Sequence, residues 1–265
     1  MGFAAEGHPG SAARQVGSGP AAALFGGRRA FWRLQLYPAA AEAGGCLYSP
    51  PRGGESRWPA DPERPALEAA RRAKGKVRRY CAANRLNRLG TLTYAGEGCH
   101  EPVVLRSDLA VFFRGLRREL GGDPFPYLWV PEWHPGGHGL HAHFAVGRYI
   151  GQTVIRDSWG RGHVHIKLLS DLPVGSGSLE ESRLAARYLA KYASKAVDAE
   201  RPAGLHRYEV AQGFQPESVY IGGGSPEHVI GQASARMGSE PAHLWRSAEQ
   251  DDWRGPPACW VAWND

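Results

Sequence analysis

The chain has 265 residues, of which 42% are hydrophobic, 22% charged and 10% aromatic, a globular composition that argues against a disordered or fibrous protein. It contains no run of eighteen apolar residues, and residues 1–30 lack the apolar stretch of a signal peptide, so we expect a cytoplasmic protein with no membrane partner. The formal net charge is +6, and it is uneven: residues 1–214 carry +10 and residues 215–265 carry −4. This distribution favours a polyanionic partner bound by the longer segment.

The four cysteines are far apart in the sequence and include no C-x-x-C pair. This spacing argues against a zinc site and against a disulfide framework. A reducing compartment follows, in agreement with the cytoplasmic expectation.

The N-terminal region, residues 1–64, is expected to be a flexible or irregular extension. Glycine, alanine and serine dominate its first thirty residues, and six prolines interrupt residues 37–65. Between these stretches, residues 31–37 have the composition of a single strand.

A helix is expected from Pro65 to Ala83, because proline suits the first helical position. Residues 69–94 around its second half contain eight basic residues and no acid. This run has two interpretations: a solvated helix face, or a DNA-binding surface. The residues predicted to contact DNA are Arg71, Arg72, Arg78 and Arg79.

The segment 65–214 is expected to form the main domain. Strands are predicted at 88–94, 125–134, 140–146 and 163–167, and further helices at 107–120, 150–159 and from 178 to about 197. Ser178 and Glu181 form a capping box that begins the last helix. This order favours an α+β fold, with one sheet covered by helices. The acidic segment 215–265 contains four tryptophans and is expected to pack on this domain.

His141 and His143 lie two residues apart on a predicted strand, so their rings project from the same face. If the preceding hairpin pairs positions that sum to 275, Glu132 lies opposite His143 and His134 lies opposite His141. Two imidazoles and one carboxylate can hold a divalent ion that polarises a phosphoryl oxygen. We predict Glu132, His141 and His143 as metal ligands, with His134 as the alternative third ligand.

Two other observations bear on this metal site. His163 and His165 repeat the H-x-H spacing without an acid on a paired strand, so we interpret them as strand residues that face DNA. Non-haem iron oxygenases also combine two histidines with one carboxylate, so the ligand set alone leaves that chemistry open.

The helix expected after residue 178 carries two tyrosines and two lysines at positions i, i+3, i+4 and i+7, which share one face. These are Tyr188, Lys191, Tyr192 and Lys195. A tyrosine hydroxyl that loses its proton can attack phosphorus and hold DNA covalently, and a lysine ammonium can hold phosphate or stabilise phenolate. An exposed face with half-buried tyrosines is the alternative. We predict all four as catalytic residues.

Three segments in this order resemble the motifs of a known family. Thr91-Leu92-Thr93-Tyr94, His141-Ala142-His143 preceded by Glu132, and Tyr188-x-x-Lys191-Tyr192-x-x-Lys195 are similar to those of the rolling-circle replication initiators of the HUH endonuclease superfamily, particularly the two-tyrosine type of plasmids and phages. The resemblance covers about residues 77–214. Ala142 departs from it, since a bulkier hydrophobic residue is usual there. Trp159-Gly160-Arg161-Gly162 is similar to a further segment of this family.

The resemblance implies a central antiparallel sheet with an RRM-like or ferredoxin-like core and a tyrosine helix laid across it. It also implies a bacterial, metal-dependent endonuclease and strand transferase that uses Mg²⁺ or Mn²⁺. Such an enzyme nicks single-stranded origin DNA, keeps the 5′-phosphate on tyrosine and later rejoins the ends. The chain has no P-loop motif, so unwinding is expected from a host helicase and synthesis from a host polymerase.

Three rival functions remain open at this point. A transposase or a relaxase of the same superfamily would use the same chemistry. A non-catalytic nucleic-acid-binding protein would use the basic run and the C-terminal tryptophans, Trp245, Trp253, Trp260 and Trp263, as stacking platforms. An oxygenase leaves the tyrosine-lysine face unexplained.

Overall fold

The structure is a computed structural model that describes residues 30–49, 64–167, 178–195, 205–253 and 255–264. Its described part forms an α+β fold with two antiparallel five-stranded sheets. Sheet I has the order β6-β3-β5-β4-β7 and sheet II the order β8-β1-β2-β10-β9. The prediction of an α+β fold with a helix-covered sheet is confirmed, whereas the second sheet was not anticipated.

The strands of sheet I are β3 (Arg88–Tyr94), β4 (Tyr127–Trp133), β5 (Leu140–Val146), β6 (Gly162–Lys167) and β7 (Glu209–Val210). Those of sheet II are β1 (Phe31–Tyr37), β2 (Glu42–Tyr48), β8 (Val219–Gly223), β9 (His243–Arg246) and β10 (Ala258–Ala262). The α-helices are α2 (Arg64–Ala83), α3 (Pro102–Glu119), α4 (Gln152–Trp159), α5 (Ser178–Lys195) and α6 (Pro226–Met237). Two 3₁₀ turns, η1 (Pro38–Ala40) and η2 (Ser247–Glu249), complete the described elements.

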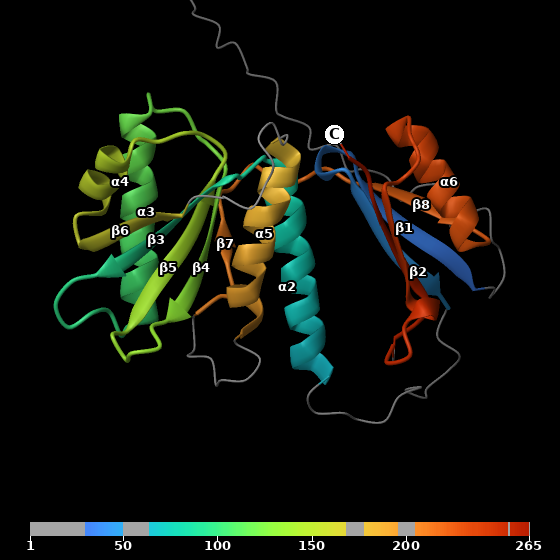
Figure 1. Ribbon diagram of the computed structural model, residues 1–265, viewed down its shortest axis with the longest axis horizontal. Coiled ribbons are helices and arrows are strands. Elements are labelled where there is room, and N and C mark those ends of the chain that lie inside the picture. Colours follow the sequence, from blue (N-terminus) through green and yellow to red (C-terminus); the bar gives the residue numbers. More distant parts are fainter. Residues whose placement is uncertain (1–29, 50–63, 168–177, 196–204, 254, 265) are drawn as a thin grey trace, which may run out of the picture.

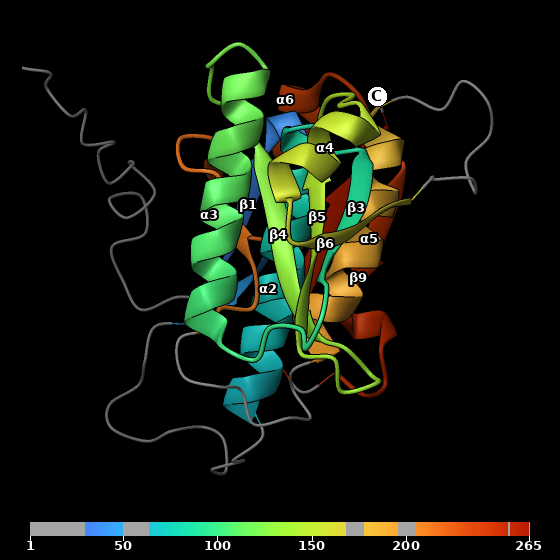
Figure 2. The ribbon, with the colours of Figure 1, turned by 90° about the vertical axis from the view of Figure 1, so that its left-hand side faces the viewer.

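The elements stack in five layers, with α2 and α5 as a central layer between the two sheets (Figure 1). Helices α3 and α4 cover the outer face of sheet I (Figure 2), and α6 covers the outer face of sheet II. The central layer packs closely because α5 turns small residues inward: Ala185, Ala186 and Ala193 are buried with Leu189 between α2 and sheet I. Leu179, at the start of α5, belongs instead to the core of sheet II.

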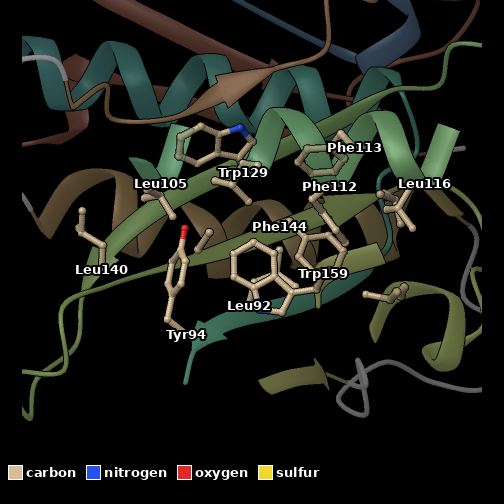
Figure 3. Packing of buried hydrophobic residues seen from close by; sticks show 14 of the residues in the cluster. Leu92, Tyr94, Leu105, Phe112, Phe113, Leu116, Trp129, Leu140, Phe144 and Trp159 are labelled. Carbon is tan, nitrogen blue, oxygen red and sulfur yellow. The ribbon is translucent and has the colours of Figure 1, made fainter. Parts of the chain in front are cut away.

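The outer core of sheet I is aromatic (Figure 3). The ring of Phe112 on α3 meets that of Trp159 edge-on, with centroids 6.0 Å apart, and both side chains are fully buried. Gly90 on β3 lies beneath Phe144, and a Cβ atom there would be 2.4 Å from the Phe144 ring. A side chain at position 90 would therefore push this ring out of the core.

Several element boundaries differ from the sequence-based expectation. Residues 37–65 were expected to be irregular coil, yet Glu42–Tyr48 form β2, which pairs with both β1 and β10. Helix α3 begins at Pro102 rather than at residue 107. Among the described residues, no helix is both long and apolar enough to cross a bilayer.

Candidate metal and nucleophile site

The inner face of sheet I presents Glu132, His141 and His143, but in a different register from the predicted one. Glu132 pairs with His141, and Val130 pairs with His143. The expected pairing was wrong by two residues, because the turn closes at His134, whose N–H donates to the carbonyl of Gly139 over 2.8 Å. A shift of two residues preserves the alternation of a strand, so all three predicted ligands still share one face.

The three side chains converge on one point. Glu132 Oε2 lies 3.1 Å from His141 Nε2 and 2.8 Å from His143 Nε2, and the two Nε2 atoms are 3.1 Å apart. Three cis ligands of an octahedral ion at ~2.1 Å would form a triangle with edges of about 3.0 Å. These residues form the one group of three or more potential metal ligands that the described residues contain. Their donor atoms and spacing fit a divalent cation.

The orientation of His143 is set by β3. Thr91 pairs with His143 across the sheet, and its Oγ1 lies 2.9 Å from Nδ1 of the ring. When Nε2 is free to bind a cation, Nδ1–H donates to Oγ1, which fixes both the tautomer and the ring orientation. Thr91 belongs to one of the sequence motifs, but its contact with His143 was not predicted.

Helix α5 places both tyrosines against the metal-ligand cluster. The ring of Tyr192 stacks on that of His143, with centroids 3.9 Å apart and planes inclined by 20°. The hydroxyl of Tyr192 donates to that of Tyr188 over 2.9 Å, so the two phenolic oxygens are adjacent. Burial, reinforced by the Tyr188 hydrogen bond and by the negative charge of Glu132, raises the pKa of Tyr192. A positive charge brought to this site would therefore favour its phenolate.

The lysines near the tyrosines differ in their positions. Lys191 is exposed on α5, and Lys195 ends the helix with a side chain outside the described part of the chain. Lys167, at the end of β6, was not predicted as a site residue, although its Nζ lies 4.9 Å from the ring centroid of Tyr188. Its position in the sequence carried one signal, since it is one of only five lysines in the chain.

His134, His163 and His165, which the sequence analysis also considered, lie near this site without joining the cluster. His134 is exposed beyond the end of β4, its ring centroid is 5.7 Å from that of His141, and its Nδ1 accepts a hydrogen bond from the N–H of Gly136. His163 and His165 are exposed on β6, and they pair with Thr93 and Thr91. They therefore occupy the same face as the metal-ligand cluster, near the sheet edge.

The predicted DNA-binding arginines of α2 face two environments. Arg71 and Arg72 are exposed. Arg78 instead donates through Nε and Nη2 to the two carboxylate oxygens of the buried Glu42, over 2.6 and 3.0 Å, and Arg79 lies 3.6 Å from the same carboxylate. That these four arginines bind DNA stays a prediction.

A comparison with known proteins gives a partial match to one family model. Residues 87–197 match the family model described as replication-associated protein ORF2/G2P. The match covers less than half of the chain, but it includes the ligand cluster on β4 and β5 and both tyrosines of α5. No curated protein and no solved structure matches the chain. The family match supports a replication-associated protein.

Proposed function

We propose that this protein is a replication initiator of the HUH type, which nicks and rejoins single-stranded origin DNA through a 5′-phosphotyrosine intermediate. The observation that carries the proposal is the contact between two potential nucleophiles and a metal-ligand cluster. Tyr192 stacks on His143, and Tyr188 lies within hydrogen-bond distance of Tyr192. A structural role for this helix face would need neither the paired hydroxyls nor the adjacent Glu-His-His set.

The proposed reaction exchanges one phosphodiester bond for another. The phenolic oxygen of Tyr188 or Tyr192 attacks the scissile phosphorus and loses its proton, and a tyrosyl phosphodiester forms. The bond to the 3′-oxygen breaks, and this oxygen takes up a proton to become the 3′-hydroxyl from which a polymerase extends. Attack by a 3′-hydroxyl on the phosphotyrosine reverses the exchange and rejoins the strand.

Glu132, His141 and His143 are the residues that would hold Mg²⁺ or Mn²⁺, and Thr91 would keep the His143 ring in the ligand orientation. The bound ion would polarise the phosphoryl oxygen and offset its charge. The chain itself supplies the rest of the positioning. Tyr192 is held by its stack on His143, while Lys191 and Lys195 would place positive charge beside the phosphate and the negative charge that forms on the phenolic oxygen as its proton leaves.

Two adjacent hydroxyls suit a cycle with two attacks. Initiation needs one nucleophile, and termination needs a second while the first still holds the parental 5′ end. The 2.9 Å contact between the Tyr188 and Tyr192 hydroxyls supports access of both to one phosphate. This feature favours a rolling-circle initiator over a relaxase or transposase, which share the chemistry and remain the second candidates.

Denaturing electrophoresis tests the proposal. The protein is incubated with labelled single-stranded origin DNA and Mn²⁺, and we expect an adduct that survives denaturation and is absent in EDTA. A protein that binds this DNA but forms no adduct under any divalent ion would instead be a non-catalytic nucleic-acid-binding protein. Joining of the retained strand to a supplied 3′-hydroxyl end would complete the cycle, and cleavage without joining would contradict the strand-transfer proposal.

A further inference from the structure

A pocket opens at the end of sheet I where β3 begins and β5 and β6 end. Its volume is about 240 Å³. The buried part of its lining is apolar and includes Phe144, Ile150 and Ile155. The volume lies below the ~300 Å³ at which pockets for drug-sized ligands begin, so the pocket suits a single flat ring system rather than a larger molecule.

The exposed part of the pocket lining has a different chemistry. It consists of three basic side chains, Arg88, Arg148 and Lys167, and one aromatic side chain, Tyr149, which is 78% exposed. The one acid in the lining, Glu181, accepts a hydrogen bond from the side-chain amide of Asn87. A basic rim, an exposed aromatic ring and an apolar interior are the features with which proteins bind unpaired nucleic acid.

The pocket is connected to the tyrosines through Lys167. This residue lines the pocket and also places its Nζ 4.9 Å from the ring centroid of Tyr188. Lys167 pairs with Leu89 on β3, two residues from Thr91, which contacts His143. Two residues along a strand span about 7 Å, so the mouth of the pocket at Leu89 and Lys167 lies close to the ligand cluster. The apolar interior, with Phe144 and Ile155, lies on the outer face of sheet I, whereas the cluster lies on the inner face, so a DNA strand that joins them passes around the end of the sheet at Lys167.

We propose that this pocket binds one unpaired nucleotide of the DNA strand, next to the phosphate at the tyrosines. The base stacks on Tyr149 and enters the apolar interior, and the flanking phosphates contact Arg88, Arg148 and Lys167. The proposal rests on the proposed function for its placement beside the cleaved bond. The pocket would hold the strand in register, so that one particular phosphodiester reaches Tyr188 and Tyr192.

Binding of fluorescent single-stranded oligonucleotides in EDTA, followed by anisotropy, tests the pocket without any cleavage. We expect Tyr149→Ala to weaken binding about tenfold, the size of one lost stacking contact, and Tyr149→Trp to restore it. The matched control is Tyr220→Ala on sheet II, because Tyr220 is 56% exposed and Arg33 lies 4.1 Å above its ring. We expect this variant to bind as the wild type does.

An oligonucleotide of abasic sugar phosphates distinguishes contacts with the base from contacts with the backbone. The wild-type protein should bind it more weakly than a strand with bases, and Tyr149→Ala should cause no further loss. Equal losses on both strands would overturn the assignment of the pocket to a base, as would a Tyr149→Ala variant that matches Tyr220→Ala. A free deoxynucleoside monophosphate should compete poorly, since it lacks the second phosphate; competition at the affinity of the strand would overturn the assignment to a DNA strand.

Failure of this proposal and failure of the proposed function give different results. If the wild type forms the covalent adduct but Tyr149→Ala binds DNA normally, only the pocket assignment is wrong. If the Tyr149 effect is present but no adduct forms with Mn²⁺, the nicking activity is wrong and the pocket assignment stands. A wild-type protein that binds none of the strands would overturn the pocket assignment directly.

Discussion

Sheets I and II pack on opposite sides of the same two helices, yet they use their polar residues differently. The inner face of sheet I directs Glu132 toward the imidazoles of His141 and His143, against which Tyr192 packs. Sheet II directs Glu42 into α2, where Arg78 and Arg79 neutralise it. The buried carboxylate of Glu42 is already neutralised by arginines, whereas the partly buried carboxylate of Glu132, which faces imidazoles, can still bind a cation.

Two arginines of α2 also contact tryptophan rings. The guanidinium of Arg78 lies 4.9 Å from the Trp260 ring centroid, and that of Arg71 lies 5.5 Å from the Trp253 ring centroid. The Trp260 contact joins β10 of sheet II to the helix, and the Trp253 contact joins the helix to the segment that precedes β10. Arg78, which also binds Glu42, therefore serves packing, whereas Arg71 stays exposed despite its tryptophan contact and remains a candidate for DNA binding, so these basic positions must be tested separately.

The largest expected effect concerns the tyrosines. Tyr188→Phe combined with Tyr192→Phe should eliminate the covalent adduct, since no phenolic oxygen remains beside the ligand cluster. Either single variant should still nick a single strand but release fewer closed circles in a replication assay. Tyr220→Phe on sheet II is the control and should behave as the wild type. If one single variant loses all adduct and the other replicates normally, the protein is a one-tyrosine enzyme.

Removal of a metal ligand should have the next largest effect. His143→Ala should reduce the rate of adduct formation by at least about 100-fold, as loss of a group that stabilises developing charge does elsewhere. Gel-shift affinity for DNA should change little, because most backbone contacts come from arginine and lysine. His243→Ala, on β9 of sheet II, is the matched control. Normal cleavage by His143→Ala would mean that the metal site is misassigned.

A substitution in sheet II should change the stability of the protein rather than its DNA cleavage. Glu42 is 2% exposed, so Glu42→Ala leaves Arg78 and Arg79 without their carboxylate and should lower the free energy of unfolding by about 3 kcal/mol. Urea denaturation measures this change. Glu217→Ala, at an exposed position, should change it little. A Glu42→Ala variant as stable as the wild type would contradict the structural role of the cluster.

A smaller effect is expected at Thr91, which contacts the proposed metal ligand His143 and is not itself a proposed ligand. Thr91→Val keeps the shape of the side chain but removes the hydroxyl at His143 Nδ1, and should weaken Mn²⁺ binding about tenfold. Titration of Mn²⁺ by calorimetry measures this affinity. Thr91→Ser should restore most of it, and equal losses in both variants would indicate altered packing instead.

The smallest expected effect distinguishes the exposed arginines of α2 from those that contact Glu42. Neutralising Arg71 and Arg72 together should reduce the salt dependence of DNA binding by a slope of about two, one for each phosphate contact. Replacing Arg78 and Arg79 should mainly reduce stability, because both contact Glu42. If neutralising Arg71 and Arg72 leaves the salt dependence of DNA binding unchanged, these residues belong to a solvated helix face.

The parts of this molecule that follow from local periodicity were predictable. The shared face of His141 and His143 follows from strand alternation, and that of Tyr188 and Tyr192 follows from helical spacing. Pairing over long sequence distances was not predictable. Strand β2 was expected to be coil because prolines interrupt residues 37–65, yet none of them lies within Glu42–Tyr48. Its Gly45 lies so close to β1 that an added Cβ atom would overlap the backbone of Arg33.

The contacts of Thr91 and Lys167 also depend on long-range pairing. Thr91 meets His143 only because β3 lies between β5 and β6, and Lys167 reaches Tyr188 only because β6 is the edge strand beside β3. The hairpin register depended on how the glycine-rich turn closes at Gly139, which composition alone does not determine. Sequence periodicity therefore predicted which candidate ligands and nucleophiles share a face, and the fold supplied their neighbours.

The most direct test of the account is to identify the residue that carries DNA. The protein is incubated with single-stranded origin DNA and Mn²⁺, digested with protease and nuclease, and analysed by mass spectrometry for a peptide that retains a nucleotide. We predict that the nucleotide is attached to Tyr188, to Tyr192, or to both in separate molecules. Attachment to any other residue, or cleavage of the DNA with no attached nucleotide, would contradict the phosphotyrosine mechanism.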